Sequence, residues 1–175
     1  MDFAAISNML LELFYIMIGI MMLSTTVLSL KDKSNPARYG TALFWALLGI
    51  IFIFGHKLPY NVVGGMLVVI GILTLTKQVK PGTIKDLDYK FGEDQANKLG
   101  IKIFLPPLMI AVAALVITQF TPISGTASIG VAAVLAMITT FIVTKATPKV
   151  FVDDSHRMIQ SVGTTSILPQ LLASL

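Results

Sequence analysis

Five long apolar segments, separated by short polar loops, limit how this chain can fold. They cover residues 9–30, 40–55, 61–76, 103–120 and 123–144. A helix needs about 20 apolar residues to cross a hydrocarbon core about 30 Å thick, with about 17 as a practical minimum. The second and third segments are short by this measure. We expect these two to thin the bilayer locally or to lie within a bundle of helices.

The composition favours lipid over water around these segments. Of the 175 residues, 55% are apolar and 13% are charged, whereas a soluble domain has about 25% charged residues. A soluble protein of this size leaves about a third of its surface exposed to water, which does not suit so apolar a chain. The sequence therefore predicts an all-α, multi-pass membrane protein with five transmembrane helices in a single transmembrane domain, residues 1–175.

The basic residues predict the orientation of the chain. Twelve of the thirteen lysines and arginines lie in the loops after the first, third and fifth segments, and only Lys57 lies in the turn between the second and third. Loops rich in basic residues stay in the cytoplasm, so we expect the N-terminus outside. The basic loops lack interleaved aromatic residues, which fits an anionic lipid surface better than nucleic acid.

The C-terminal segment, residues 155–175, differs from the five others. A polar start leads into a stretch of small and hydroxyl-bearing residues, and then into a short apolar run that contains Pro169. This pattern predicts a re-entrant or discontinuous helix, because irregular backbone at membrane depth is tolerated only beside protein or a water-filled cavity. The alternative is an interfacial helix followed by a truncated sixth span.

Broken membrane helices can bind ions and anions. Freed carbonyls coordinate a sodium ion, and N–H groups at the start of a half-helix attract a carboxylate. The sequence therefore offers candidate residues for binding a substrate or a sodium ion, and these are Ser161, Gly163, Thr164, Thr165, Ser166 and Gln170.

Few ionisable residues are placed to carry a proton through the membrane. Glu12 is the one charged residue well inside an apolar segment, and we expect it near the outer interface because it lies about one turn from the end of its segment. His56 and His156 both fall in expected loops, where a lone histidine is usually solvated. Sodium is therefore a more plausible coupling ion than a proton.

Sequence motifs of enzymes are missing. The chain has no HExxH, GxSxG or phosphate-binding glycine loop, and it has no cysteine. We expect no enzyme activity, no catalytic residue, no cofactor and no metal site other than one for sodium. An enzyme would need a cytoplasmic active site around Asp153, Asp154 and His156.

Small and aromatic residues predict how the helices pack. Gly64, Gly65 and Gly71 in the third segment would let another helix approach closely, as would Ala132 and Ala136 in the fifth. Trp45 and Tyr39 are expected to anchor the second segment near a membrane interface. A short surface helix is expected over 93–99, within the long loop before the fourth segment.

Four stretches of the chain resemble a known family. They are KSNP at 33–36, TALFWALLGIIF at 41–52, TLTKQV at 74–79 and SILPQLLA at 166–173. Together they are similar to domain of unknown function family 979, a family of bacterial cytoplasmic (inner) membrane proteins. Its members are commonly described as one subunit of a predicted 5-oxoproline transporter.

The resemblance implies a partner, a fold and a function. The partner is a second hydrophobic subunit encoded nearby, although a homo-oligomer also fits, and the fold is built from inverted repeats with re-entrant hairpins. Family members continue beyond Leu175, so we expect this chain to be a fragment or one half of a longer repeat. The expected function is a subunit of a secondary transporter for a small organic anion. The alternative is a structural or assembly membrane protein without transport activity.

Overall fold

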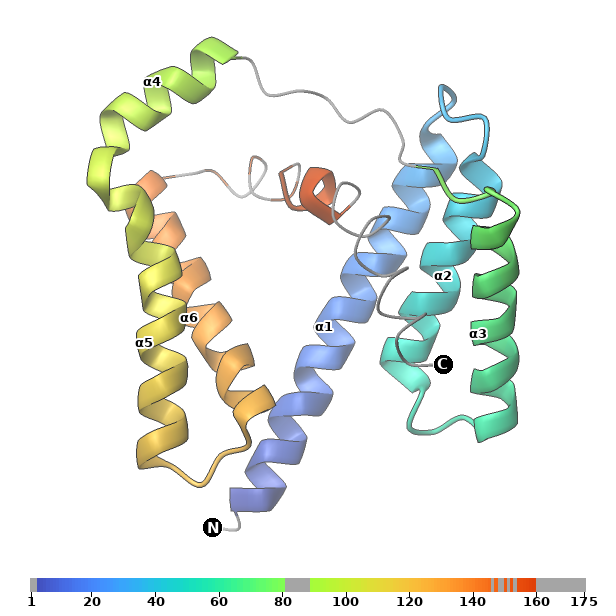
Figure 1. Ribbon diagram of the computed structural model, residues 1–175, viewed down its shortest axis with the longest axis horizontal. Coiled ribbons are helices and arrows are strands. Elements are labelled where there is room, and N and C mark those ends of the chain that lie inside the picture. The colour runs from blue at the N-terminus through green and yellow to red at the C-terminus, as the bar shows by residue number, and fades with distance from the viewer. Residues whose placement is uncertain are drawn as a thin grey trace. The chain divides into compact units, whose positions relative to one another are not determined.

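The computed structural model describes residues 3–80, 89–145, 147, 150, 152 and 154–159. Every regular element within these residues is a helix (Figure 1). The elements in chain order are α1 (Phe3–Lys31), α2 (Arg38–Phe54), α3 (Tyr60–Leu75), α4 (Tyr89–Leu99), the 3-10 helix η1 (Gly100–Phe104), α5 (Leu105–Phe120) and α6 (Gly125–Thr144). All five apolar segments are thus helical, and α4 confirms the predicted surface helix.

Three helices are long and apolar enough to cross a membrane. They are α1, the continuous helical stretch Gly92–Phe120 and α6. The other two apolar helices are shorter, with 17 residues in α2 and 16 in α3. The lengths support a membrane protein, and the count of five transmembrane helices stays a prediction.

The chain divides into two compact units, and α1 contributes to both. The first unit combines residues 1–14 with residues 86–151, and the second combines residues 15–85 with residues 152–175. The first unit therefore contains the start of α1 together with α4, η1, α5 and α6. The second contains the rest of α1 together with α2 and α3.

In the first unit, α5 and α6 form an antiparallel hairpin and lie side by side (Figure 1). Ser124 begins α6, because its hydroxyl accepts a hydrogen bond from the N–H of Ala127. The N–H of Ser124 in turn donates to Ser7 Oγ on α1. Ala132 and Ala136 are buried, which confirms that small residues of α6 face a packing surface.

In the second unit, α1 and α2 pack closely at two glycines that were not predicted as packing positions. A Cβ on Gly19 of α1 would lie 2.4 Å from Ile53 Cγ1, and one on Gly49 of α2 would lie 3.0 Å from the Leu23 side chain. By contrast, a Cβ on Gly64, Gly65 or Gly71 would meet nothing within 4 Å. Within the described residues, no helix packs closely against these three positions of α3.

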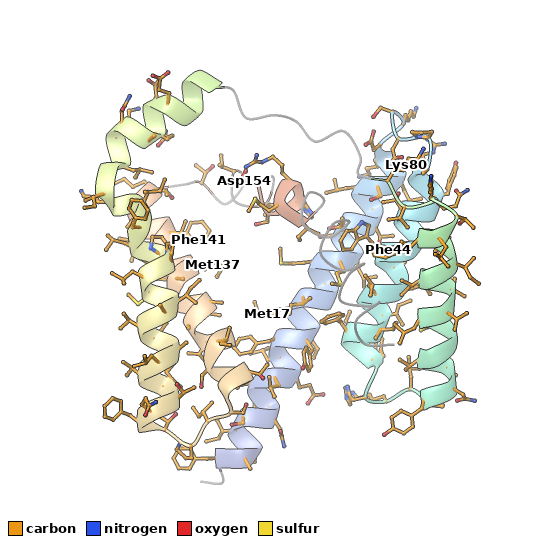
Figure 2. The ribbon with its side chains drawn as sticks, in the orientation of Figure 1. Met17, Phe44, Lys80, Met137, Phe141 and Asp154 are labelled. Carbon is orange, nitrogen blue, oxygen red and sulfur yellow. The ribbon has the colours of Figure 1, made fainter. Side chains whose placement is uncertain are left out.

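The core of the second unit is an aromatic and aliphatic cluster between α2 and α3. Its buried members are Phe44, Trp45, Leu48 and Ile70, and Figure 2 shows Phe44 within this part of the chain. The Trp45 ring meets the Phe44 ring edge to face, with centroids 5.2 Å apart. Only 1% of Trp45 is exposed, so its predicted role as an interface anchor is wrong. Tyr39 is 67% exposed and remains available for that role.

Basic residues gather at one end of each unit. In the second unit, Lys31 ends α1, Arg38 begins α2 and Lys77 follows α3, whereas Lys57 lies in the turn at the opposite ends of α2 and α3. In the first unit, Lys102 precedes α5 and Lys145 follows α6. The turn that joins α5 to α6 carries no charge.

Candidate functional site

The candidate binding residues predicted from the sequence lie outside the described residues. These are Ser161, Gly163, Thr164, Thr165, Ser166 and Gln170. The helical stretch 154–159 precedes them directly in the chain. The contacts of this stretch therefore show which part of the second unit the chain touches just before the predicted site.

His156 lies on this helical stretch and not in a loop, which corrects the sequence prediction. Its side chain is half-buried, and Nδ1 lies 3.5 Å from Oγ1 of Thr25 on α1. Thr25 is fully buried and its hydroxyl donates to the carbonyl of Met21. A hydroxyl can donate one proton and also accept, so Thr25 Oγ1 can donate to Met21 O and still accept from His156 in the tautomer that carries its proton on Nδ1.

Two further contacts bring α1 and the 154–159 stretch to the same place. Met22 of α1 and Ile159 both pack against the buried cluster that contains Trp45. On α1, Met22, Thr25 and Ser29 share one face, because positions three and four apart are neighbours on a helix. His156 and Ile159 are likewise neighbours on theirs. Side chains of α1 and of the 154–159 stretch thus meet at Thr25 and at the buried cluster that contains Trp45.

We call Thr25, Ser29, Trp45 and His156 the polar junction. Two of its members are buried donors without a hydrogen-bond partner among the described residues, namely Ser29 Oγ and Trp45 Nε1. Ser29 is 3% exposed and Trp45 is 1% exposed. An unsatisfied buried polar group costs about 1–3 kcal/mol. The polar junction can therefore offer two hydrogen-bond donors to an acceptor in an otherwise apolar setting.

Sequence reasoning missed Thr25 and Ser29, although a signal was present. The stretch 24–26 reads Ser-Thr-Thr, and Ser29 follows one turn after Thr25. In an apolar helix such a run of hydroxyls is unusual. Ser24 and Thr26 each bond to a carbonyl one turn back on α1, so Ser29 alone among the four hydroxyls keeps a proton without an acceptor in the described structure.

The neighbouring charges on the 154–159 stretch form a local ion pair. Arg157 donates to Asp154 Oδ1 from both Nε, at 2.9 Å, and Nη2, at 2.7 Å. Half of the Asp154 side chain is exposed, and such pairs contribute little to stability. Among the described residues, no three His, Asp or Glu side chains come together as a metal site would require.

A second polar cluster joins the start of α2 to the segment after α3. Asn35 Nδ2 and Thr41 Oγ1 both donate to the carbonyl of Lys80, and the N–H of Lys80 donates to Thr41 Oγ1. Figure 2 shows Lys80 at this end of α2. A Cβ on Gly40 would lie 2.4 Å from Gln78 O, so the two segments touch. We call Asn35, Gly40, Thr41, Gln78 and Lys80 the clasp.

The clasp brings three separate stretches of the sequence into contact. Residues 33–36, 41–52 and 74–79 each contribute to it or adjoin it, and the same stretches carry the family resemblance. Asn35 and Thr41 are both buried, and Asn35 Oδ1 also accepts from the N–H of Ala37. The clasp therefore has a structural role, holding α3 against α2 at the basic end of the unit.

Comparison with known proteins places the chain in a family. The family described as "Protein of unknown function (DUF979)" matches residues 12–175. Searches of curated proteins and of solved structures found no match. Because the match covers nearly the entire chain, this protein belongs to the DUF979 family.

Proposed function

We propose that this chain is one subunit of a secondary transporter that moves a small organic anion across a bacterial inner membrane, with 5-oxoproline as the first candidate substrate. The observation that carries the proposal is the polar junction. Two buried donors, Ser29 Oγ and Trp45 Nε1, have no acceptor among the described residues. Polar groups buried inside a membrane protein are costly and often mark a functional site.

The proposed topology has five crossings with the N-terminus outside. The basic end of each unit then faces the cytoplasm, as the positive-inside rule requires. With 29 residues, α1 is about 43 Å long and exceeds the hydrocarbon core by about 13 Å. If Lys31 lies at the inner boundary, the outer boundary falls about 20 residues earlier, close to Glu12. The carboxylate of Glu12 then reaches the headgroups.

The proposed substrate route passes the C-terminal segment. The hydroxyls and backbone of residues 163–166 would contact the substrate or a sodium ion. The contact of His156 with Thr25 and the packing of Ile159 on the buried cluster would hold the start of that segment beside α1 and α2. Sodium suits this arrangement because its ligands are neutral oxygens. Neither Thr25 nor Ser29 changes its charge during such a cycle.

A partner subunit is part of the proposal. The exposed side of α3, with the open positions Gly64, Gly65 and Gly71, offers a smooth apolar surface of the kind that membrane helices use for close approach. The partner would be a second hydrophobic subunit or a second copy of this chain.

Uptake into cells or vesicles tests the function. The chain is expressed with its neighbouring gene, and accumulation of labelled 5-oxoproline is measured with an inward sodium gradient, with a potassium gradient and with empty membranes. We expect uptake above the empty membranes that depends on sodium. A well-folded complex that takes up nothing under any gradient would rule out 5-oxoproline as the substrate. Uptake that is equal in sodium and potassium would remove sodium as the coupling ion.

A further inference from the structure

We propose that the indole N–H of Trp45 and the hydroxyl of Ser29 together bind the carboxylate of a small organic anion. This inference rests on the proposed function for the reason that an anion reaches the site at all. It assigns the recognition of charge to α1 and α2. Neither Trp45 nor Ser29 carries a charge, so the site recognises the anion by directed hydrogen bonds alone.

Both donors, Trp45 Nε1 and Ser29 Oγ, are buried. Trp45 lies inside the aromatic cluster and Ser29 is closed off on α1, yet neither has an acceptor among the described residues. Buried N–H and O–H groups in folded proteins nearly always find a partner, and an exception calls for an explanation such as a ligand. Two exceptions in one small unit point to one missing acceptor with more than one oxygen.

The register of α1 against α2 shows how far apart Ser29 and Trp45 lie along the helix axis. Gly19 lies against Ile53, and Leu23 lies against Gly49. Carried along the antiparallel pair, these contacts place Ser29 level with Leu43, which is two residues from Trp45. At 1.5 Å per residue, that difference is about 3 Å along the helix axis. The two donors therefore lie at nearly the same depth along the α1–α2 pair.

The chemistry of the donors selects the ligand class. An indole N–H only donates, so it cannot bind a cation or another donor. A carboxylate accepts through both oxygens, and hydrogen bonds to an ionised acceptor are about twice as strong as neutral ones. In a site from which water is excluded, this preference grows further, because electrostatic interactions strengthen as the local dielectric falls.

The 154–159 stretch lies close to the proposed site. Ile159 packs against the cluster that contains Trp45, and His156 contacts Thr25, one turn from Ser29.

Trp45 is the sole tryptophan of the chain, so its fluorescence reports on this site directly. The full chain in lipid nanodiscs is titrated with 5-oxoproline, with acetate, and with 2-pyrrolidone, a neutral lactam that lacks the carboxylate. We expect a saturable change in tryptophan emission with 5-oxoproline and with acetate, and none with 2-pyrrolidone. An equal response to 2-pyrrolidone would overturn carboxylate recognition.

Ser29→Ala and Ser24→Ala form the matched pair of variants. The hydroxyl of Ser24 already donates to the carbonyl of Met21, so Ser24→Ala leaves the site intact. We expect Ser29→Ala to raise the Kd for 5-oxoproline at least about tenfold and Ser24→Ala to leave it unchanged. Equal Kd values for the two variants would overturn the assignment of Ser29. Binding of labelled 5-oxoproline to Trp45→Phe, which keeps an aromatic ring without the N–H, should weaken by a similar factor, and unchanged binding would overturn the role of Trp45.

This binding assay separates the failure of the site from the failure of the function. Sodium-dependent uptake without any change in emission would overturn the site and leave the transporter proposal standing. A carboxylate-dependent change in emission that Ser29→Ala abolishes would support the site even if no uptake is found. Should Trp45→Phe fail to fold, the emission of the wild-type protein and of the two serine variants still decides the question.

Discussion

The imidazole Nδ1 of His156 lies 3.5 Å from the hydroxyl oxygen of Thr25, although the two residues are 131 positions apart in the chain. Thr25 is buried on α1, and the contact brings the last described residues back to the first helix of the second unit. Neither sequence periodicity nor residue type predicts such a pairing. Because of this contact, a substitution at Thr25 is the simplest way to change the position of the 154–159 stretch.

Thr25→Val should loosen that stretch. Valine keeps the shape of threonine but removes the oxygen that contacts His156 Nδ1, and a hydrogen bond contributes about 0.5–1.5 kcal/mol. For a protein of this size we expect Tm in detergent to fall by a few degrees. Thr26→Val is the control, because Thr26 Oγ1 bonds to Met22 O on its own helix. Equal melting of the two variants would argue against the contact.

Gly19→Ala should destabilise the α1–α2 hairpin. The new Cβ would lie 2.4 Å from Ile53 Cγ1 and 2.9 Å from Gly49 O, so the backbones must separate, at a cost of about 1–3 kcal/mol. Gly65→Ala is the matched control, since its Cβ meets nothing within 4 Å. Alanine also favours a helix over glycine by about 1 kcal/mol. Melting curves of the chain expressed alone should show a lower Tm for Gly19→Ala and an equal or higher Tm for Gly65→Ala. The reverse order would contradict the packing described here.

The helices were predictable from sequence, whereas their contacts were not. The apolar runs end where Pro36 and Pro59 and their polar neighbours interrupt them, because proline stops a helix and asparagine or serine favours turns. Which glycine faces a neighbouring helix depends instead on the register between helices. Gly19 and Gly64 therefore look alike in sequence, yet only Gly19 is closely packed.

The surroundings of Trp45, a residue of the proposed site, were likewise not predictable from the sequence. A tryptophan near the start of a membrane segment usually marks the interface. Here, however, the side chain of Trp45 lies in the buried core beside Phe44. The polar junction was hidden for a related reason. Thr25 and His156 come from distant helical stretches, and only tertiary structure brings them into contact.

The clasp makes a prediction about hydrogen exchange. The backbone N–H of Lys80 donates to Thr41 Oγ1, a side chain, and not to a helical carbonyl. Thr41→Val removes that acceptor, so the Lys80 amide should exchange with deuterium at least several times faster than in the wild-type protein. The amide of Thr76 bonds to Ile72 O within its own helix, and its exchange should not change. Unaltered exchange at Lys80 would exclude the clasp as the source of its protection.

Cysteine labelling tests whether the short helix α2 crosses the membrane. The chain has no cysteine, so Lys33→Cys and Lys57→Cys each introduce one reactive thiol, at opposite ends of α2 in exposed positions. The 17 residues of α2 span about 26 Å, which is short of the hydrocarbon core by about 4 Å and can be accommodated by local thinning of the bilayer. We expect an impermeant maleimide to label Lys57→Cys in intact cells and Lys33→Cys only after permeabilisation. Labelling of both from the same side would mean that α2 does not cross, and the five-crossing topology would have to be abandoned.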